Sequence, residues 1–344
     1  MRKQIVIVLD FGAQYSQLIA RSVREQHVYC EVLPFSVSAG RLRELAPGAI
    51  ILSGGPASIY DQGAPRCDPG IFDLDVPVLG ICYGMQLVGV HEKAQVKRAV
   101  KREYGKAVLS IKSFDDLFAG FEHQGTAQVW MSHGDSLARL PAGYELLAET
   151  TNCPVAAMRH VGKKIYGVQF HPEVAHTRQG GRIIANFLFN VAGLTPDWTA
   201  GSFIEDTTQR IRDEVGDERV ICGLSGGVDS SVAAMLMHRA VGDRLYCIFV
   251  DNGLLRKNEA AAVENTFRCH HKINLVCVES SGKFLSALKS VIDPERKRKI
   301  IGETFIRVFE AQARALGDVS YLVQGTLYPD VIESVSVNGP SATI

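Results

Sequence analysis

The sequence lacks any excess of charge of one sign. Lys and Arg together number 37 of its 344 residues, and Asp and Glu together also number 37, so the formal net charge is zero. No block of basic residues is long enough to form a nucleic-acid arm or a membrane-binding patch. We therefore expect neither a nucleic acid nor a membrane surface as a partner.

Long hydrophobic runs and a cysteine framework are also missing. No apolar stretch approaches the roughly 20 residues of a membrane helix, and the N-terminus leads into a strand-like run without a secretory signal. The eight cysteines include no CxxC pair. The group at 269–277 (Cys269, His270, His271 and Cys277) fits no standard zinc spacing. These features predict a soluble cytoplasmic protein with reduced thiols.

The length is enough for two ordinary domains. Apolar strand-like runs alternate with amphipathic helical segments in both halves, which is typical of α/β folds. In the first half the runs lie at 5–9, 28–33, 49–52 and 77–81, and shorter strands follow from about 108 to 168. A segment containing Pro and Gly at 194–201 has the composition of a linker. We therefore predict domains at 1–193 and 202–344.

The segment 78–86 predicts a nucleophile at a sharp turn. Its apolar run ends at Cys82, which lies between Gly80 and Gly84 before a helical pattern begins. A side chain at a tight strand-to-helix turn is pushed clear of the sheet, and the helix start favours a thiolate. The alternative is a buried structural thiol. The flanking glycines favour the nucleophile.

A second candidate group follows the strand-like run 165–170. An imidazole at a strand end, with a carboxylate two residues on, can act as a general base with its orienting partner. His171 and Glu173 have this arrangement, so with Cys82 they form a candidate catalytic triad. The turn 53–56 follows another strand, and its Gly55 can bring a backbone N–H close to a substrate. Without the other motifs, it would be an ordinary turn.

The second half contains a glycine- and serine-rich segment between a strand-like run at 219–224 and a helix expected at 232–239. This segment, 225–231, combines mobile backbone, hydroxyl groups and one carboxylate at a helix N-terminus. Such a combination predicts a phosphate cradle with Asp229 as a magnesium ligand. The Gly-Lys-Ser/Thr ending of a Walker A loop is absent. Further strand-like runs at 245–253, 274–278 and 321–326 predict a second, parallel-sheet nucleotide domain.

Three motifs of the first domain resemble those of the class I (triad) glutamine amidotransferases. They span 80–86, 132–135 and 167–174, and the second of these was expected as a polar loop between strands. The resemblance implies a mixed sheet with flanking helices, and a Cys82 thiol that attacks the side-chain amide of glutamine. His171 would move the proton and Glu173 would hold the imidazole. The resemblance assigns the oxyanion and the glutamine to Gly55, Tyr83, Gln86, Ser132, His133, Gly134 and Asp135.

The segment 224–231 is similar to the loop of the N-type ATP pyrophosphatases, which have an adenine nucleotide alpha hydrolase-like fold. Together with 250–256 and 324–333, it implies a ligase that uses ATP and Mg²⁺ to adenylate XMP and then aminates it with ammonia from glutamine. The implied contacts to ATP and pyrophosphate are Ser225, Gly226, Gly227, Val228, Asp229, Ser230, Ser231, Val250 and Gly325.

The family pattern continues past Ile344 with the rest of this domain and a dimerisation domain, and the full-length family forms homodimers. We therefore expect the second domain of this chain to be incomplete. Two alternatives remain open at this point. One is a glutaminase that serves another acceptor, and the other is a fragment that binds a nucleotide or a partner without turnover.

The chain departs from the family pattern after the helix of the first motif. Most members have two glycines there, whereas this chain has Lys93 and Ala94. A left-handed residue other than glycine costs on the order of 1 kcal/mol. We expect a local loss of stability without a direct effect on the chemistry.

Overall fold

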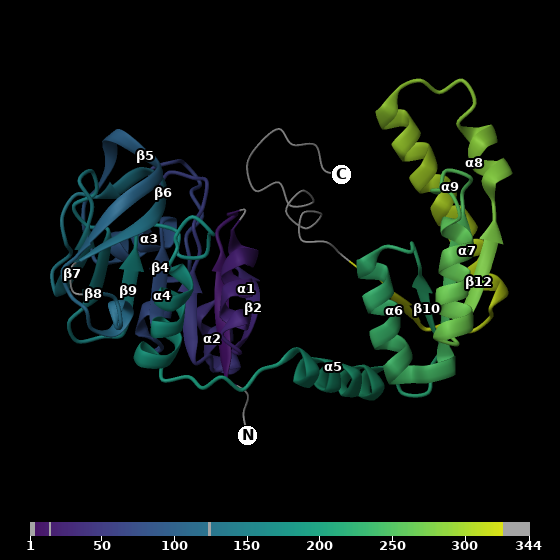
Figure 1. Cartoon of the computed structure of the whole chain (residues 1–344), viewed down its shortest axis with the longest axis horizontal. Helices are drawn as coiled ribbons and strands as arrows, with labels where there is room; N and C mark the ends of the chain where they lie inside the picture. The colour runs from purple at the N-terminus through teal and green to yellow at the C-terminus, as the bar shows by residue number, and fades with distance from the viewer. Residues whose placement is uncertain (1–3, 14, 123–124, 326–344) are drawn as a thin grey trace. The chain divides into compact units, whose positions relative to one another are not determined.

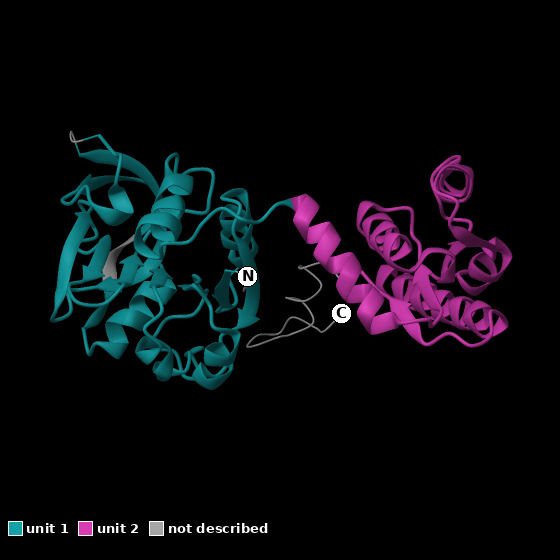
Figure 2. Ribbon diagram, turned by 90° about the horizontal axis from the view of Figure 1, so that it is seen from below, with its two compact units in different colours: residues 1–199 teal, residues 200–344 magenta. Residues whose placement is uncertain are grey.

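The computed structural model describes residues 4–13, 15–122 and 125–325. The chain divides into two compact units, 1–199 and 200–344 (Figure 2). Each unit is described by itself. The part of the predicted nucleotide motif at 326–333 lies outside the described residues. No helix of the described ranges is long and apolar enough to cross a membrane.

The first unit is built on a nine-stranded mixed sheet with strand order β2-β1-β3-β4-β9-β8-β7-β5-β6 (Figure 1). Strands β1 to β4 and β9 run parallel, and the strands from β8 onward pair antiparallel. Its elements are β1 (Ile5–Asp10), α1 (Ser16–Glu25), β2 (Tyr29–Pro34), α2 (Ala39–Leu45), β3 (Ala49–Leu52), η1 (Pro69–Asp73), β4 (Val78–Ile81), α3 (Tyr83–His91), β5 (Val96–Ile111), η2 (Asp116–Phe118), β6 (Thr126–Leu137), β7 (Tyr144–Glu149), β8 (Ala157–His160), β9 (Ile165–Val168), α4 (Gly180–Asn186) and the π-helical turn η3 (Phe187–Val191).

The parallel part of this sheet is buried on both faces, which explains its continuous apolar runs. Along β1, Val6 and Val8 belong to one hydrophobic cluster, while Ile7 and Leu9 belong to the other. Helices α1 and α4 contribute to the first cluster, and α2 and α3 contribute to the second. The carboxyl ends of the parallel strands are therefore held rigidly, and ligands of open α/β sheets bind at these ends.

The antiparallel part corrects one prediction. The segment Ser132–Asp135 was expected as a loop, but it lies within β6, where His133 pairs with Glu103 and Asp135 pairs with Arg98 of β5. The ladder shifts register between Arg98 and Glu103. Polar composition indicated a turn, but cross-strand pairing with the long strand β5 keeps the segment extended.

The second unit contains a four-stranded parallel sheet with strand order β12-β11-β10-β13, so the predicted parallel arrangement is confirmed. Its first helix, α5, begins at Ala200, inside the segment 194–201 that was predicted as a linker. The elements are α5 (Ala200–Val215), β10 (Val220–Gly223), α6 (Val228–Val241), η4 (Gly242–Arg244), β11 (Leu245–Asp251), α7 (Glu259–Glu264), the π-helical turn η5 (Asn265–His270), β12 (Asn274–Glu279), α8 (Ser281–Ala287), α9 (Pro294–Ala315) and β13 (Tyr321–Val323).

Helix α3 ends in the left-handed turn that the glycine comparison predicted. Lys93 has φ of +57°. Its N–H donates to the Val90 carbonyl at 3.0 Å, and the Ala94 N–H donates to the Gly89 carbonyl at 2.8 Å. These two bonds form a Schellman motif, in which glycine is the usual residue at the left-handed position.

We expect Lys93→Gly to raise the free energy of unfolding by about 1 kcal/mol, because glycine removes the steric cost of the left-handed residue. Urea unfolding of the variant and the wild type measures the difference. Lys163→Gly is the control, since Lys163 is an exposed loop residue outside the set with positive φ. Equal effects of the two substitutions would contradict this explanation.

Candidate active site

The turn between β4 and α3 holds the cysteine in a strained conformation. Cys82 has φ of +52° and ψ of −103°, which is unusual for a residue other than glycine. Its N–H donates to the Val168 carbonyl at 2.7 Å. A Cβ on Gly84 would lie 2.4 Å from the Leu52 carbonyl oxygen, and one on Gly80 would lie 2.6 Å from the Gly84 backbone. Close packing therefore requires both flanking glycines, as expected of a nucleophile elbow.

The Cys82 side chain is 5% exposed and has two polar contacts of known length. Its Sγ lies 3.6 Å from the Ser132 carbonyl oxygen, which accepts from the thiol. The Gln169 Nε2 donates to the same sulfur at 3.5 Å. The predicted nucleophile thus lies at the junction of the ends of β4 and β9 with strand β6.

His171 and Glu173 form a buried pair beside the cysteine. The Nδ1 atom of His171 lies 2.7 Å from Oε1 of Glu173, and both side chains are almost inaccessible. Burial acts to lower the pKa of His171. The Glu173 carboxylate and the hydrogen bond with Cys82 outweigh this effect and raise the pKa well above its usual value. Since Nδ1 faces the carboxylate, Nε2 is the ring atom left for the thiol.

Backbone contacts to β6 fix the position of the imidazole. The His171 N–H donates to the Trp130 carbonyl at 3.0 Å. The Thr177 hydroxyl donates to the His171 carbonyl at 2.6 Å and accepts from the Trp130 N–H at 3.0 Å. The histidine is thus held from both sides of its own peptide unit.

We expect Glu173→Gln to remove stability that depends on pH. The folded pKa of His171 is raised, so its contribution is complete below the unfolded value of about 6.5 and is lost as pH rises through the folded pKa. The difference in unfolding free energy between wild type and variant should therefore be largest near pH 6 and decrease at higher pH. Urea unfolding across this range measures it, and a constant difference would contradict the assignment.

The Gly54-Gly55 turn lies directly beside the triad. A Cβ on Gly54 would be 3.1 Å from Cε1 of His171 and 3.8 Å from Cβ of Cys82. A Cβ on Gly55 would be 3.1 Å from the Phe11 carbonyl oxygen and 3.3 Å from the Tyr83 ring. The Gly84 N–H already donates to the Ser53 carbonyl at 3.1 Å. It is therefore occupied, whereas Gly55 and Tyr83 remain the predicted donors to an oxyanion.

A cavity of about 510 Å³ opens in front of Cys82. It brings together all the residues predicted for glutamine and the oxyanion: Gly55, Tyr83, Gln86, Ser132, His133, Gly134 and Asp135. The Gln86 side chain is fixed by donating to the Asp135 carbonyl at 2.8 Å. The cavity is large enough for an amino-acid substrate.

Four polar residues of this cavity were missed from the sequence: Ser58, Asp61, Arg98 and Tyr104. The Ser58 hydroxyl donates to the Asp135 carboxylate. Together with Asp61 and Arg98, Asp135 gives the wall groups of both charge signs, which suits a zwitterionic amino acid. These residues belong to no recognisable motif, so only the folded arrangement identifies them.

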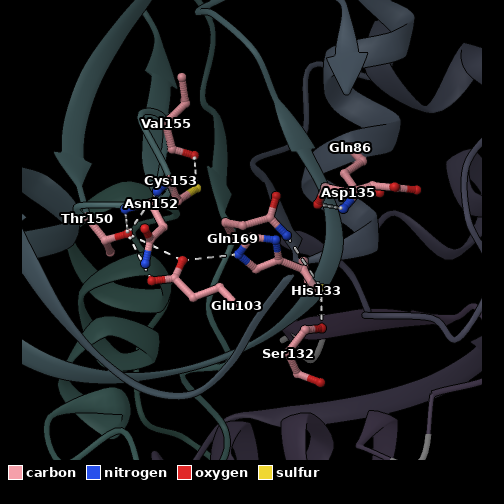
Figure 3. Close-up of polar contacts among 11 residues, drawn as sticks. Gln86, Glu103, Ser132, His133, Asp135, Thr150, Asn152, Cys153, Val155 and Gln169 are labelled. Atoms are coloured by element: carbon pink, nitrogen blue, oxygen red, sulfur yellow. Dashed lines mark hydrogen bonds and ion pairs between the residues drawn. The ribbon is translucent and has the colours of Figure 1, made fainter. Parts of the chain in front are cut away.

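A second imidazole–carboxylate pair lies behind the cavity wall (Figure 3). The Nε2 atom of His133 lies 3.5 Å from Oε2 of Glu103. The Thr150 hydroxyl lies 3.3 Å from both carboxylate oxygens of Glu103 and accepts from the Cys153 N–H. Burial lowers the pKa of His133, and Glu103 opposes this shift. His133 thus lines the cavity as predicted, but its side chain is turned towards a buried carboxylate.

In the second unit, the predicted phosphate-binding segment is a tight turn at the N-terminus of α6. Gly226 has φ of +77°, and a Cβ there would lie 2.8 Å from the Val263 side chain. The hydroxyls of Ser225 and Ser230 lie 2.9 Å apart, and the Ser231 hydroxyl donates to the Gly227 carbonyl at 2.6 Å. Helix α6 begins at Val228, earlier than predicted, so Val228, Asp229, Ser230 and Ser231 occupy its first turn.

The remaining predicted nucleotide contacts differ in exposure. Gly325 is exposed and follows β13, which pairs with β10. The loops after β10 and β13 therefore leave the same edge of the parallel sheet. Val250 is only 4% exposed, and its side chain packs in a hydrophobic cluster. Any contact of Val250 with a nucleotide would therefore involve its backbone.

Asp229 is the predicted magnesium ligand. It is an exposed residue in the first turn of α6. Within the described ranges, no group of three or more His, Cys, Asp or Glu side chains is arranged to hold a metal. A single carboxylate still fits magnesium, because this ion usually combines one or two carboxylates with substrate phosphates and water.

Comparison with known proteins finds relatives of both units. Residues 7–191 match the family described as glutamine amidotransferase class-I, and residues 218–311 match the tRNA methyl transferase HUP domain. A GMP synthase (glutamine-hydrolyzing) of Natranaerobius thermophilus is 53% identical over 97% of this chain and 65% of its own length. The protein of the same name from Carboxydothermus hydrogenoformans is 55% identical over 96% and 64%, respectively.

A third relative of this name, from Clostridium botulinum strain Langeland, is 52% identical over 100% of the chain and 67% of its own length. The chain thus spans 64% to 67% of the length of these curated relatives. A crystal structure from Thermoplasma acidophilum, of a protein described as a candidate component of GMP synthase, is 31% identical with a TM-score of 0.51. The match covers 56% of this chain and 94% of that one.

Proposed function

Because the chain belongs to the glutamine-hydrolysing GMP synthase family and carries a class I glutamine amidotransferase domain, we propose that its first unit hydrolyses glutamine to glutamate and ammonia. The observation that carries this proposal is the buried arrangement of Cys82, His171 and Glu173 at the end of the 510 Å³ cavity. A nucleophile, a base within its reach and an orienting carboxylate are the parts that acyl transfer requires.

In the proposed reaction, glutamine enters the cavity with its side-chain amide facing the cysteine. The Cys82 sulfur attacks the amide carbon, and the thiol proton passes to Nε2 of His171. Glu173 holds the ring through Nδ1 and stabilises the imidazolium. The N–H groups of Gly55 and Tyr83 then stabilise the negative charge on the carbonyl oxygen.

Collapse of the tetrahedral intermediate breaks the C–N bond. His171 gives its proton to the leaving nitrogen, which departs as ammonia, and a γ-glutamyl thioester with Cys82 remains. Water then attacks this thioester while His171 takes up its proton. The C–S bond breaks, glutamate leaves, and Cys82 is restored.

For the complete protein we propose that the second unit uses ATP to adenylate XMP and that ammonia displaces AMP to give GMP. The N–H groups and hydroxyls of residues 225–231 would hold the pyrophosphate at the helix start. Asp229 would hold Mg²⁺, which neutralises phosphate charge when bound. We also propose a homodimer for the full-length family member. A cytoplasmic location is supported by the unpaired cysteines of the described ranges.

Trapping of the thioester tests the glutaminase proposal. The chain is incubated with glutamine and hydroxylamine, and γ-glutamyl hydroxamate and glutamate are measured by mass spectrometry. We expect hydroxamate to form at the expense of glutamate, because hydroxylamine competes with water for the same thioester. Glutamate release without any hydroxamate would argue against covalent catalysis, and release of neither product would refute a glutaminase.

A further inference from the structure

Gln169 contacts the reacting sulfur and has no part in the steps above. It directly follows β9, and its side chain is completely buried. Its Nε2 donates to Sγ of Cys82 at 3.5 Å. The other amide atom, Oε1, is buried without a hydrogen-bond partner among the described residues. Figure 3 shows the Gln169 amide among the polar groups behind the cavity.

The two known contacts of the sulfur respond differently when the thiol loses its proton. The Ser132 carbonyl can only accept a hydrogen bond, so it favours the thiol and repels a thiolate. The Gln169 amide can donate to either form. A hydrogen bond to an ionised acceptor is roughly twice as strong as one between neutral groups. Deprotonation therefore weakens the contact with Ser132 and strengthens the one with Gln169.

The backbone holds the Gln169 amide in this position. The Gln169 N–H donates to the Ala156 carbonyl at 2.8 Å, and the Cys82 N–H donates to the carbonyl of the adjacent Val168 at 2.7 Å. Donor and sulfur are thus tied to the same strand end. A fixed donor in a buried site stabilises charge without reorganisation when the charge develops.

We propose that Gln169 is a further catalytic residue, whose side-chain amide stabilises the Cys82 sulfur as an anion. The anion occurs twice in the cycle: before attack on glutamine, and again when the C–S bond of the thioester breaks and its electron pair returns to sulfur. The inference rests on the proposed glutaminase function.

Other titratable groups surround this sulfur and would influence the same equilibrium. His171, from the loop after β9, hydrogen bonds to Cys82 and is paired with Glu173. Cys153, before β8, interacts electrostatically with Cys82, and burial raises the pKa of its own thiol to about 12. His133 on β6 interacts with His171 and is paired with Glu103. Because substitution of Gln169 leaves all of these groups in place, it isolates the amide.

Alkylation of Cys82 by iodoacetamide as a function of pH tests the proposal. The wild type is compared with Gln169→Met, which keeps the side-chain length without a donor, and with Gln169→Glu, which replaces the donor with a carboxyl group. Gln128→Met is the matched control, because Gln128 donates to the His176 carbonyl, away from the sulfur. Mass spectrometry of the Cys82 peptide separates this thiol from the other cysteines, and thermal melting verifies folding.

We expect the midpoint of Cys82 alkylation to rise by about one pH unit in Gln169→Met, the size of one charged hydrogen bond. It should rise further in Gln169→Glu, because a carboxylate repels the thiolate. Glutaminase kcat should fall about 10- to 100-fold in Gln169→Met with little change in KM. Gln128→Met should match the wild type in all three measurements.

The outcomes separate this inference from the proposed function. If wild-type Cys82 titrates at low pH and Gln169→Met has the same midpoint, the role of Gln169 is refuted while the nucleophile stands. If wild-type Cys82 reacts no faster at neutral pH than the exposed Cys269, the proposed nucleophile itself fails. Should Gln169→Met not fold, Gln169→Glu decides the question, because it conserves shape.

Discussion

Replacing Cys82 with alanine is expected to reduce glutamate release at least about 10⁴-fold, the scale of loss for a residue of a catalytic triad. Cys82 combines a strained backbone, a helix start and a hydrogen bond with a histidine of raised pKa. No other thiol of the described ranges lines the cavity. Without the sulfur, the C–N bond can break only by direct attack of water.

Cys67→Ala is the matched control for this variant. Cys67 lies in the same unit but outside the cavity lining, and burial raises the pKa of its thiol to about 11. We expect the control to keep its full rate of glutamate release in a coupled glutamate dehydrogenase assay. Comparable losses in the two variants would indicate a general structural effect of removing a thiol. Full activity of Cys82→Ala would refute the triad.

The part of the site that the sequence predicted consists of residues with strong local signals. The elbow at Cys82 and the pair His171–Glu173 each lie within a few residues of a strand end, so local sequence sets their geometry. The resemblance to class I glutamine amidotransferases and ATP pyrophosphatases is confirmed by the family comparisons. So is the fold class, with one mixed and one parallel sheet.

Other parts of the site depend on contacts between distant segments. Glu103 faces His133 because the pairing of β5 with β6 shifts register just before it, and no local pattern announces such a shift. For the same reason, Ser132–Asp135 resembles a loop in sequence but forms part of a strand. Arg98 reaches the cavity from the other side of this shift. Tertiary pairing therefore overrides local composition in this part of the fold.

The end of β9 links the fold to the proposed chemistry. Within four residues, it supplies the Val168 carbonyl that fixes the Cys82 backbone, the Gln169 amide that donates to the sulfur, and the His171 ring. These groups move together, since β9 lies between β4 and β8 inside the sheet. A displacement of the turn that follows β9 should therefore affect the base directly.

Two adjacent glycines allow this coupling to be tested. Both lie in the first turn of α4, yet their surroundings differ. A Cβ on Gly180 would lie 1.8 Å from the carbonyl oxygen of Pro172, between the catalytic histidine and glutamate. A Cβ on Gly181 would meet only the end of the Gln26 side chain, at 4.0 Å. The same substitution thus has opposite expected effects at neighbouring positions.

We expect Gly180→Ala to lower the free energy of unfolding by about 3 kcal/mol, the upper range for an overpacked site. The Pro172 peptide must also move, and displacement of a catalytic group by about 1 Å can cost roughly 100-fold in rate. Gly181→Ala should instead raise stability by up to about 1 kcal/mol, because alanine is the better helix former. Urea unfolding and glutamate release measure both variants. If Gly180→Ala lost stability but kept its full kcat, the position of His171 would be independent of the turn, and the backbone contacts with Trp130 and Thr177 would suffice to hold the base.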